Sequence, residues 1–395
     1  QISRMKVPWI VLFVSSVVSI GCCQNKREIE DLSTIVRHFS ARIASYLISP
    51  PYGSTDNFVF SGMRLVSSLV TMHALGSANI KAEIKSILGL TRSLEKKGCD
   101  VMKVVTEYKA VEATHFGVLF NSTLFHRPNM NIKSEAVGGP CVAGMVQPLD
   151  FTNKPIAIAT VNEWYDVWGE LFYSHYLIQA LEANTNELFM SRLRMRVVME
   201  TPFQYSDNIQ FTNIKGNKDD LEAMEKAGNF AFKFSVQHKV YMLREDFPGD
   251  RFSSVIILPK YETEDFESTL KALFEVELFS NILLTASSLS NKTNMWLRMP
   301  ELQVKTRVDV KDILQSIGLR SINDKKSLQK LTSETSQIFQ LPHSEFIQHV
   351  ADELGSNDKS YIFEVSQPFI FVILDKKFCV PLKVVVFTGL NKFGD

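Results

Sequence analysis

The C-terminal part of the chain constrains the fold most, because two strongly apolar segments lie close together near its end. These segments are Pro368–Leu374 and Val384–Leu390, and each has the length and apolar character of a buried strand. An acidic stretch that closes at Gly355 precedes them, and only twelve residues, Ser356–Gln367, separate this glycine from the first segment. The pattern predicts two core strands that follow a short, polar, exposed loop.

The rest of the chain predicts a mixture of helices and strands in one α+β domain. Apolar residues recur at helical spacing from Leu32 to Ile48, and Ser61 is suited to cap a helix that runs to Leu75. No internal repeat, low-complexity tract or linker divides the sequence, which favours a single domain. The other predicted elements are helices over 82–88, 155–182, 266–274 and 310–317, and strands over 57–60, 119–125, 187–199, 230–243, 252–258 and 294–304.

Composition and the common catalytic motifs exclude several classes of function. Lys plus Arg and Asp plus Glu both number 43, so no net charge attracts nucleic acid or an acidic membrane. The chain has no G-x-S-x-G nucleophile turn, no H-E-x-x-H zinc motif and no glycine-rich phosphate loop. We therefore predict a protein that is not an enzyme, has no cofactor or metal site, and recognises a partner through local surface.

The N-terminal residues predict a secretory signal peptide. Lys6 precedes an apolar run, Val7–Ile20, which ends in small residues and is too short to span a bilayer. Cleavage after Cys23 is favoured over cleavage after Gly21, and a buried N-terminal strand is the alternative to a signal peptide. The predicted organisation is a signal peptide at 1–23, of which 1–4 precede the first Met and need not belong to the natural product, and one domain at 24–395.

Glycosylation sequons and scattered cysteines agree with secretion. Asn121 and Asn291 each begin an N-x-S/T triplet and are predicted glycosylation sites. After cleavage Cys99, Cys141 and Cys379 remain, without the spacing of a zinc site or a disulfide framework. At most one bridge is expected among them, which leaves a spare, buried thiol.

Short fragments along almost the whole mature chain, from Leu32 to Asn391, resemble the serpin family. The segment Asn57–Gly62 is similar to the family's N-x-x-x-S-P motif, with Gly62 in place of proline. Each fragment alone is weak evidence for the resemblance, but together they occur in the same order as in the family. The others are Ala74–Leu90, Asn121–Phe125, Asn162–Trp164, Pro202–Phe203, Met224–Phe230, Val255–Pro259, Leu297–Pro300 and Ile317–Leu319.

The resemblance implies a serpin-like α+β fold with about nine helices around three β-sheets, and it assigns residues to two sites. A hydrogen-bonded shutter of Ser, Asn and His beneath the moving sheet corresponds to Ser61, Ser191 and His343, with Ser191 in the place of the asparagine. The family's N-A-x-x-F-x-G-x-W stretch, which begins at Ser191, keeps none of its marked residues. The protease-bait loop corresponds to Gly355, Ser356, Asn357, Asp358, Lys359 and Ser360.

In the family's mechanism, a protease cleaves the bait loop and the freed loop inserts into a sheet. The bait loop of this chain is roughly half as long as that mechanism requires. The prediction is a secreted, monomeric glycoprotein that does not trap proteases and acts by binding an extracellular protein. The alternative is a serine-protease inhibitor with Lys359–Ser360 as its bait bond, which suits a trypsin-like protease. These departures from the family pattern resemble those of insect male accessory-gland serpin-like proteins, and this resemblance implies a role in seminal fluid.

Two further side-chain patterns leave alternatives open. Arg192, Arg194 and Arg196 share one face of a predicted strand and suit either an anionic partner or a solvated, salt-bridged face. Trp164 and Trp168 stand one helical turn apart, and such a pair forms a packing face more often than a binding site.

Overall fold

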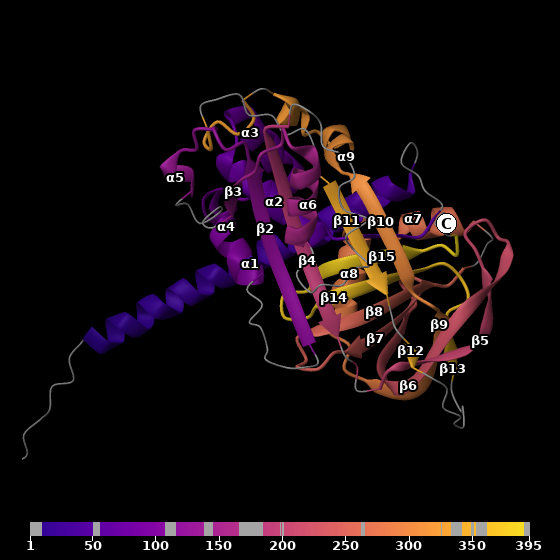
Figure 1. Cartoon of the computed structure of the whole chain (residues 1–395). Coiled ribbons are helices and arrows are strands. Elements are labelled where there is room, and N and C mark those ends of the chain that lie inside the picture. Colours follow the sequence, from indigo (N-terminus) through magenta and orange to yellow (C-terminus); the bar gives the residue numbers. More distant parts are fainter. Residues whose placement is uncertain are drawn as a thin grey trace, which may run out of the picture.

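The structure, a computed structural model, describes residues 10–49, 56–106, 116–137, 145–165, 185–197, 199, 201–261, 265–324, 326–332, 342–348, 351–352 and 362–390 (Figure 1). At 10–25, 116–117, 119, 135, 137, 165, 194, 196–197, 307–309, 342–348 and 351–352 it describes secondary structure alone. The helices are α1 (Ile10–Ile48), α2 (Gly62–Leu75), α3 (Ala78–Leu88), α4 (Arg92–Thr106), α5 (Ser134–Val137), α6 (Lys154–Tyr165), α7 (Phe266–Ala272), α8 (Val276–Ser287), α9 (Lys311–Ser316) and the 3-10 helix η2 (Arg320–Asn323).

The strands in the described part of the chain form three sheets, and the α+β class is confirmed. Ten strands make one sheet in the order β1-β15-β14-β8-β7-β6-β5-β12, with β9 and then β13 joined to β6; β3-β2-β4 and β10-β11 are the smaller sheets. The strands are β1 (Phe58–Phe60), β2 (Phe116–His126), β3 (Val146–Pro148), β4 (Glu187–Val197), β5 (Phe203–Thr212), β6 (Lys218–Ser235), β7 (Val240–Asp246), β8 (Phe252–Pro259), β9 (Lys292–Pro300), β10 (Gln303–Asp309), β11 (Pro342–Gln348), β12 (Ala351–Asp352), β13 (Ile362–Glu364), β14 (Phe369–Asp375) and β15 (Val380–Phe387).

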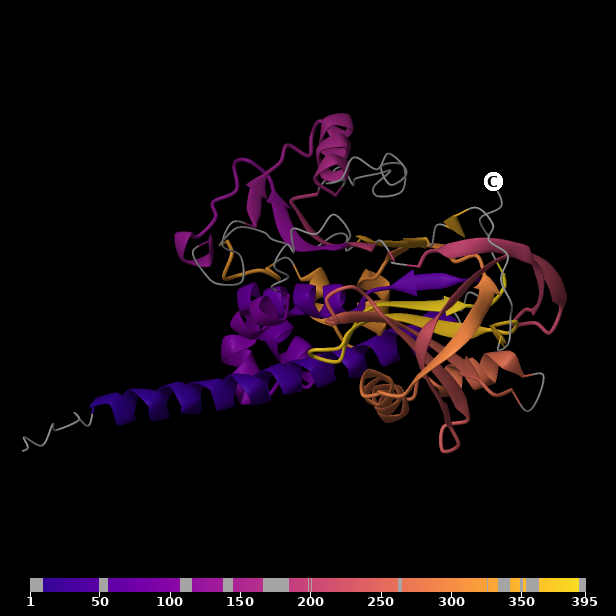
Figure 2. The same cartoon turned by 90° about the horizontal axis from the view of Figure 1, so that it is seen from below.

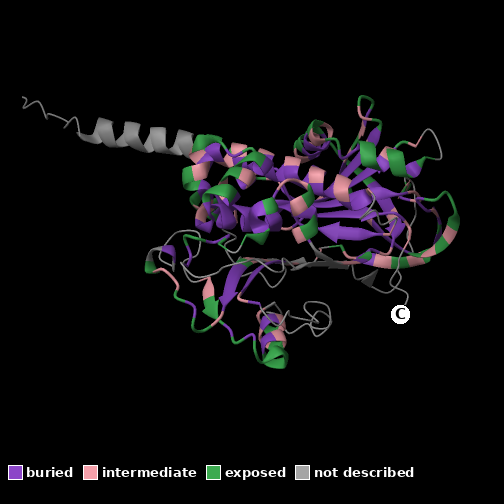
Figure 3. Cartoon of the chain, turned by 90° about the horizontal axis from the view of Figure 1, so that it is seen from above, coloured by how far each residue is buried: buried purple, intermediate pink, exposed green. Residues whose placement is uncertain are grey.

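The two apolar C-terminal segments form central strands of the ten-stranded sheet, as predicted. β14 lies between β8 and β15 and is antiparallel to both, and every residue of β14 and β15 is buried. Figure 3 shows the buried residues concentrated in these strands and in the helices beside them. Both faces of β14 and β15 are therefore covered, which explains why these strands are apolar apart from Asp375 and Lys383.

Asn57 joins the N-terminal motif to the C-terminal strands. Its side-chain oxygen accepts hydrogen bonds from the main-chain N–H groups of Thr388 (2.6 Å) and Gly389 (3.1 Å). Gly389 has φ +81, and a Cβ there would collide with the ring of Phe211. Two of the sequence motifs are thus held together by one asparagine and one required glycine.

Helix α2 begins where the sequence predicts, because Ser61 caps it. The Ser61 hydroxyl accepts a hydrogen bond from the main-chain N–H of Arg64 at 3.3 Å. The next residue, Gly62, lies against Ser40 of α1, where a Cβ would stand 3.0 Å from the Ser40 Cβ and closer still to its hydroxyl. The glycine that replaces the family's proline therefore permits a close approach of α1 and α2.

The sheet β3-β2-β4 lies between two helical layers. Figure 2 shows α6 on its outer side and the N-terminal helices on its inner side. A second hydrophobic core fills the space beneath α6 and is separate from the main core. Its buried members are Phe125, Leu149, Phe151, Ala157, Val161, Leu188 and Met190.

Several predicted boundaries are wrong. The segment 230–243 is a hairpin of β6 and β7, and the segment 294–304 belongs to two strands, β9 and β10, in different sheets. The first error arises because the turn at 236–239 contains neither Gly nor Pro, and Lys239 takes the positive φ (+52) itself. Helices α4 and α8 were not predicted, and the predicted helix 155–182 is described only as far as Tyr165.

Candidate functional site

The described strands on either side of the bait loop both belong to the ten-stranded sheet. Before the loop, β12 pairs in parallel with the start of β5, through Ala351 and Phe203. After the loop, β13 pairs in parallel with β9, through Ile362 and Trp296. The predicted loop 356–367 is therefore too long, because Ile362–Glu364 is a strand. Gly355, Ser356, Asn357, Asp358, Lys359 and Ser360 lie outside the described residues.

Side-chain contacts fix β13 in place. Arg298 of β9 pairs with Glu364 at 3.1 Å and also donates to the main-chain oxygens of Asp207 and Asn208. The Phe363 ring contacts Phe232 and Tyr241 edge-on, with centroids 5.5 and 6.2 Å away. The chain therefore leaves the bait segment along an anchored strand.

A buried arginine that the sequence analysis missed contacts two of the predicted shutter residues, Ser61 and Ser191. Arg64 of α2 is 1% exposed, and its guanidinium donates to the main-chain oxygen of Ser191 and, at 3.4 Å, to the Ser191 hydroxyl. The Ser68 hydroxyl also reaches the Ser191 hydroxyl at 3.4 Å. Because Ser61 accepts from the main-chain N–H of Arg64, this arginine connects two of the predicted shutter residues.

The third predicted shutter residue, His343, lies in β11, where its backbone is opposite Val308 of β10. The structure describes only its strand position, so its predicted hydrogen bonds remain untested. The sequence signal that could have revealed Arg64 is that it is the one Lys, Arg, Asp or Glu in the helix Gly62–Leu75. Such a residue is either solvated or paired inside the protein, and the sequence alone does not distinguish the two.

Arg192, the first residue of the predicted arginine stripe, is not solvated. Arg192 is 8% exposed, and its guanidinium carbon lies 4.3 Å from the centroid of the Trp164 ring. Trp164 also contacts Phe125 edge-on at 6.1 Å, so it packs α6 on β4 and β2. Arg194 and Arg196 continue β4, where they are opposite Leu119 and Gly117 of β2, and Trp168 lies outside the described residues.

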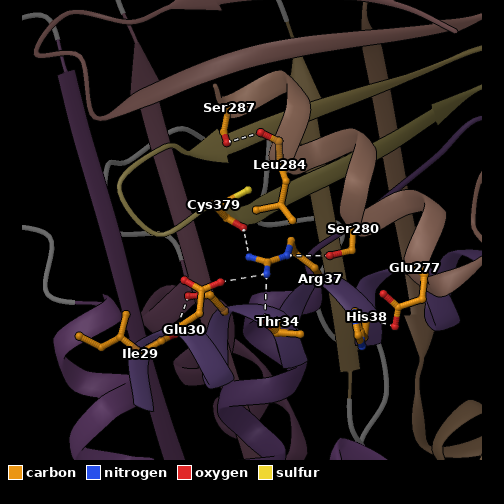
Figure 4. Close-up of polar contacts among 11 residues, drawn as sticks. Ile29, Glu30, Thr34, Arg37, His38, Glu277, Ser280, Leu284, Ser287 and Cys379 are labelled. Carbon is orange, nitrogen blue, oxygen red and sulfur yellow. Dashed lines mark hydrogen bonds and ion pairs between the residues drawn. The ribbon is translucent and has the colours of Figure 1, made fainter. Parts of the chain in front are cut away.

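The cysteines agree with the expectation of a spare thiol. Cys99 is disulfide-bonded, and Cys379 is free and buried. Burial raises the pKa of the Cys379 thiol, although Arg37 lowers it in part. Figure 4 shows Arg37 beside the Cys379 carbonyl, to which it donates at 3.1 Å, while it also donates to Ser280 (2.9 Å) and Thr34 (2.8 Å). This cluster holds α1, α8 and the β14–β15 turn together.

The two sequons lie in different settings. Asn291 is exposed in the turn before β9, and Thr293 of the same sequon is exposed too. Asn121 is exposed in the middle of β2, but its Thr123 is 1% exposed and donates to the main-chain oxygen of Met145 at 2.8 Å. The folded chain therefore displays the Asn291 sequon more openly than the Asn121 sequon.

The described residues contain no group of three or more His, Cys, Asp or Glu side chains arranged to hold a metal ion. In the same part of the chain, no helix has the length and apolarity needed to cross a membrane.

Comparison with known proteins places the whole architecture in one family. A family model described as serpin (serine protease inhibitor) matches residues 35–389. The chain is 21% identical to antichymotrypsin-2 of Bombyx mori over 237 residues, 57% of this chain and 62% of that protein, so it spans about three-fifths of that relative. It is 20% identical to neuroserpin of Rattus norvegicus over 82% of this chain and 84% of that protein.

Solved structures agree on the fold. Thyroxine-binding globulin in complex with thyroxine superposes with a TM-score of 0.76 at 16% identity, over 90% of this chain and 98% of that chain. A structure described as a tumour suppressing serpin superposes with a TM-score of 0.76 at 18% identity, over 91% of this chain and 99% of that chain. The family model covers most of the chain, so this protein belongs to the serpin family.

Proposed function

We propose that the protein is a secreted serpin-family glycoprotein that does not trap proteases covalently and acts by binding a protein partner in an extracellular fluid. Members of the family are typically protease inhibitors. The observation that carries the proposal is the short connection between β12 and β13, whose flanking strands pair with the same sheet.

The length of this connection limits how far a cleaved end can travel. From Glu353 to Lys359 the chain spans at most about 23 Å, at ~3.3 Å per residue. If β12 also detached, the free segment from His349 to Lys359 would span about 36 Å. A compact domain of this size has a radius of gyration of about 21 Å and is roughly 50 Å across. A protease attached at Lys359 therefore cannot be carried across the domain by strand insertion.

The residues of the segment also oppose insertion. A strand that enters a sheet buries alternate side chains, and Asn357, Asp358 and Lys359 would bring polar or charged groups with them. Each such group without a partner costs roughly 1–3 kcal/mol. The length and the composition of the bait segment thus both oppose its insertion into a sheet.

A second candidate function is reversible inhibition of a trypsin-like serine protease through Lys359–Ser360. Reversible binding requires a rigid loop and no insertion, and a short segment between two paired strands favours rigidity. Two of the matched relatives are named antichymotrypsin-2 and antitrypsin, both from Bombyx mori. In this case Lys359 would enter the protease's specificity pocket.

Secretion, processing and site of action are part of the same proposal. The signal peptide at 1–23 delivers a monomeric domain at 24–395, glycosylated at Asn291 and Asn121, to an extracellular fluid. The resemblance to insect accessory-gland serpin-like proteins supports seminal fluid as that fluid. Loss of one glycan mass in Asn291→Gln and in Asn121→Gln, measured on secreted protein, tests the two sites separately.

The test of the main proposal is incubation of the mature protein with trypsin-like proteases, followed by denaturing gels and residual-activity assays. We expect cleavage near Lys359 or no reaction, with protease activity unchanged. An SDS-resistant band at the summed mass would contradict the proposal, as would a rise of tens of degrees in Tm after cleavage. Inhibition that is lost in Lys359→Gln but kept in Lys326→Gln, an exposed control lysine, would favour the reversible inhibitor.

A further inference from the structure

Two lysines from distant parts of the chain, Lys81 and Lys330, meet at the corner between α2 and α3; we call them the corner lysines. Lys81 stands in the first turn of α3, and its main-chain N–H donates to the oxygen of the capping residue, Ser77, at 3.0 Å. The main-chain N–H of Lys330 donates to the oxygen of Leu75, the last residue of α2, at 2.9 Å. The two lysine side chains lie beside each other, and burial together with this contact lowers the pKa of Lys81 to about 8.

The segment that carries Lys330 is fixed on both sides of this lysine. The main-chain N–H of Ser77 donates to the Ser327 oxygen at 2.9 Å, and that of Lys133 donates to the Leu331 oxygen at 2.9 Å. Leu331 is itself fully buried. Main-chain hydrogen bonds therefore hold the corner lysines together, so their proximity is a property of the fold.

The nearby carboxylates are engaged with other partners. Glu83 of α3 accepts hydrogen bonds from the main-chain N–H and from the hydroxyl of Ser321, both at 2.9 Å. Glu95 of α4 pairs with Lys85 at 2.5 Å. In the part of the chain that the structure describes, no carboxylate forms an ion pair with either corner lysine. The two positive charges at this corner are therefore not compensated by these residues.

A histidine ring lies at the same corner. His73, in the last turn of α2, is 9% exposed, and burial followed by the charge of Lys81 lowers its pKa. Lys330 and Lys85 act in the same direction, and Glu95 opposes them. Three lysines and one carboxylate thus face a neutral imidazole, and a neutral imidazole still carries one N–H that can donate to an anion.

We propose that the corner lysines bind a small tetrahedral dianion, either free sulfate or phosphate or the phosphate group of a monoester, which bridges their two amino groups. Each ammonium group has three N–H donors and no acceptor, so an anion between them replaces a repulsion with charge-assisted hydrogen bonds. The first turn of α3 supports this, because the positive end of a helix dipole opposes a cation and favours an anion. Two uncompensated charges favour a dianion over a monoanion. None of these residues belongs to the bait segment, so the site does not depend on the proposed function.

The test is thermal unfolding of the intact mature protein at pH 8 with sodium sulfate, sodium phosphate or glycerol phosphate, each compared with sodium chloride at equal ionic strength. The variants are Lys81→Gln and Lys330→Gln, which each remove one of the two charges. Lys271→Gln is the matched control, because Lys271 is an exposed lysine of another helix, α7. Lys330 is exposed as well, so Lys330→Gln should fold even if Lys81→Gln does not.

We expect sulfate and phosphate to raise the Tm by about 2–3 °C at roughly twenty times their Kd. Lys81→Gln and Lys330→Gln should lose this rise, and Lys271→Gln should keep it. A similar rise with glycerol phosphate would identify phosphate monoesters as ligands, whereas a rise with the free ions alone would restrict the site to inorganic anions. No rise beyond that in sodium chloride, or an equal rise in all three variants, would overturn the site.

A second measurement follows the proton that an anion should bring to Lys81. With a pKa of about 8, this lysine is about half neutral at pH 8, and a bound anion favours its charged form. Calorimetry of sulfate binding in buffers of different ionisation enthalpy should therefore show uptake of about half a proton per anion, which Lys81→Gln should abolish. Binding without proton uptake would contradict a bridge through Lys81. Neither readout uses a protease, so the anion site can fail while the proposed function stands, and the reverse.

Discussion

Replacement of Gly62 by alanine should destabilise the protein through one identifiable neighbour. The added Cβ would stand 3.0 Å from the Ser40 Cβ and 3.2 Å from its Cα, and nearest to the Ser40 hydroxyl. Contacts this short force the two helices apart, and overpacking of this kind typically costs about 1–3 kcal/mol. Alanine normally favours a helix over glycine by up to about 1 kcal/mol, so we expect a net loss of roughly 1–2 kcal/mol.

Changes at Ser40 should relieve this loss in a graded manner. Ser40→Ala removes the hydroxyl but keeps the Cβ at 3.0 Å, and Ser40→Gly leaves the Cα at 3.2 Å as the nearest atom. Ser40→Gly is itself destabilising, because it places glycine in a helix and loses the hydrogen bond from the Ser40 hydroxyl to the Val36 oxygen (2.7 Å). In the double variant Gly62→Ala/Ser40→Gly, the loss of stability should be smaller than the sum of the two single losses by at least about 1 kcal/mol. The corresponding difference should be smaller when Ser40→Ala replaces Ser40→Gly.

The measurement is urea unfolding followed by circular dichroism and tryptophan fluorescence for the two single variants and the double variant. Gly98→Ala is the matched control, because it adds a Cβ to another helical glycine whose nearest neighbour is the Val70 side chain at 3.2 Å. It should show no coupling to Ser40→Gly. Additivity of Gly62→Ala and Ser40→Gly within about 0.5 kcal/mol would refute the role assigned to this contact.

Two further predictions follow from charge and burial. Burial, together with the neighbouring Lys330, lowers the pKa of Lys81 from 10.5 to about 8. Between these two pH values the folded state binds fewer protons than the unfolded state, so the free energy of unfolding should rise from pH 8 towards pH 10.5. Lys330→Gln should reduce this rise, which urea unfolding at several pH values would measure. The Cys379 thiol, with its pKa raised by burial, should react with a thiol reagent only after denaturation, and fast reaction of the native protein would contradict its burial.

The parts of the fold that local chemistry determines were predicted from the sequence. Ser61 caps α2 as expected, Gly89 ends α3 with φ +65, and the apolar runs of β14 and β15 form a covered pair. Each of these depends on residues a few positions apart. The β6–β7 turn was missed because Lys239 adopts a conformation that usually requires glycine.

The candidate site was only partly predictable, because its main contacts join distant parts of the chain. Ser191 was assigned to the shutter, but its partner Arg64 lies 127 residues earlier and is identified only by the fold. The Arg192 and Trp164 patterns were both noted, although their contact depends on how α6 packs on β4. A sequence shows that a buried cation needs a partner, and tertiary structure decides which one.

The length and the composition of the bait segment oppose strand insertion in different ways. The segment from Glu353 to Lys359 limits the distance that a cleaved end can travel, whereas Asn357, Asp358 and Lys359 would bring polar or charged groups into the sheet that it enters. A longer segment with the same residues would still bury groups without partners, and a segment of small residues with the present length would be too short to carry a protease across the domain. Both properties would therefore have to change together before this serpin scaffold could trap a protease by insertion.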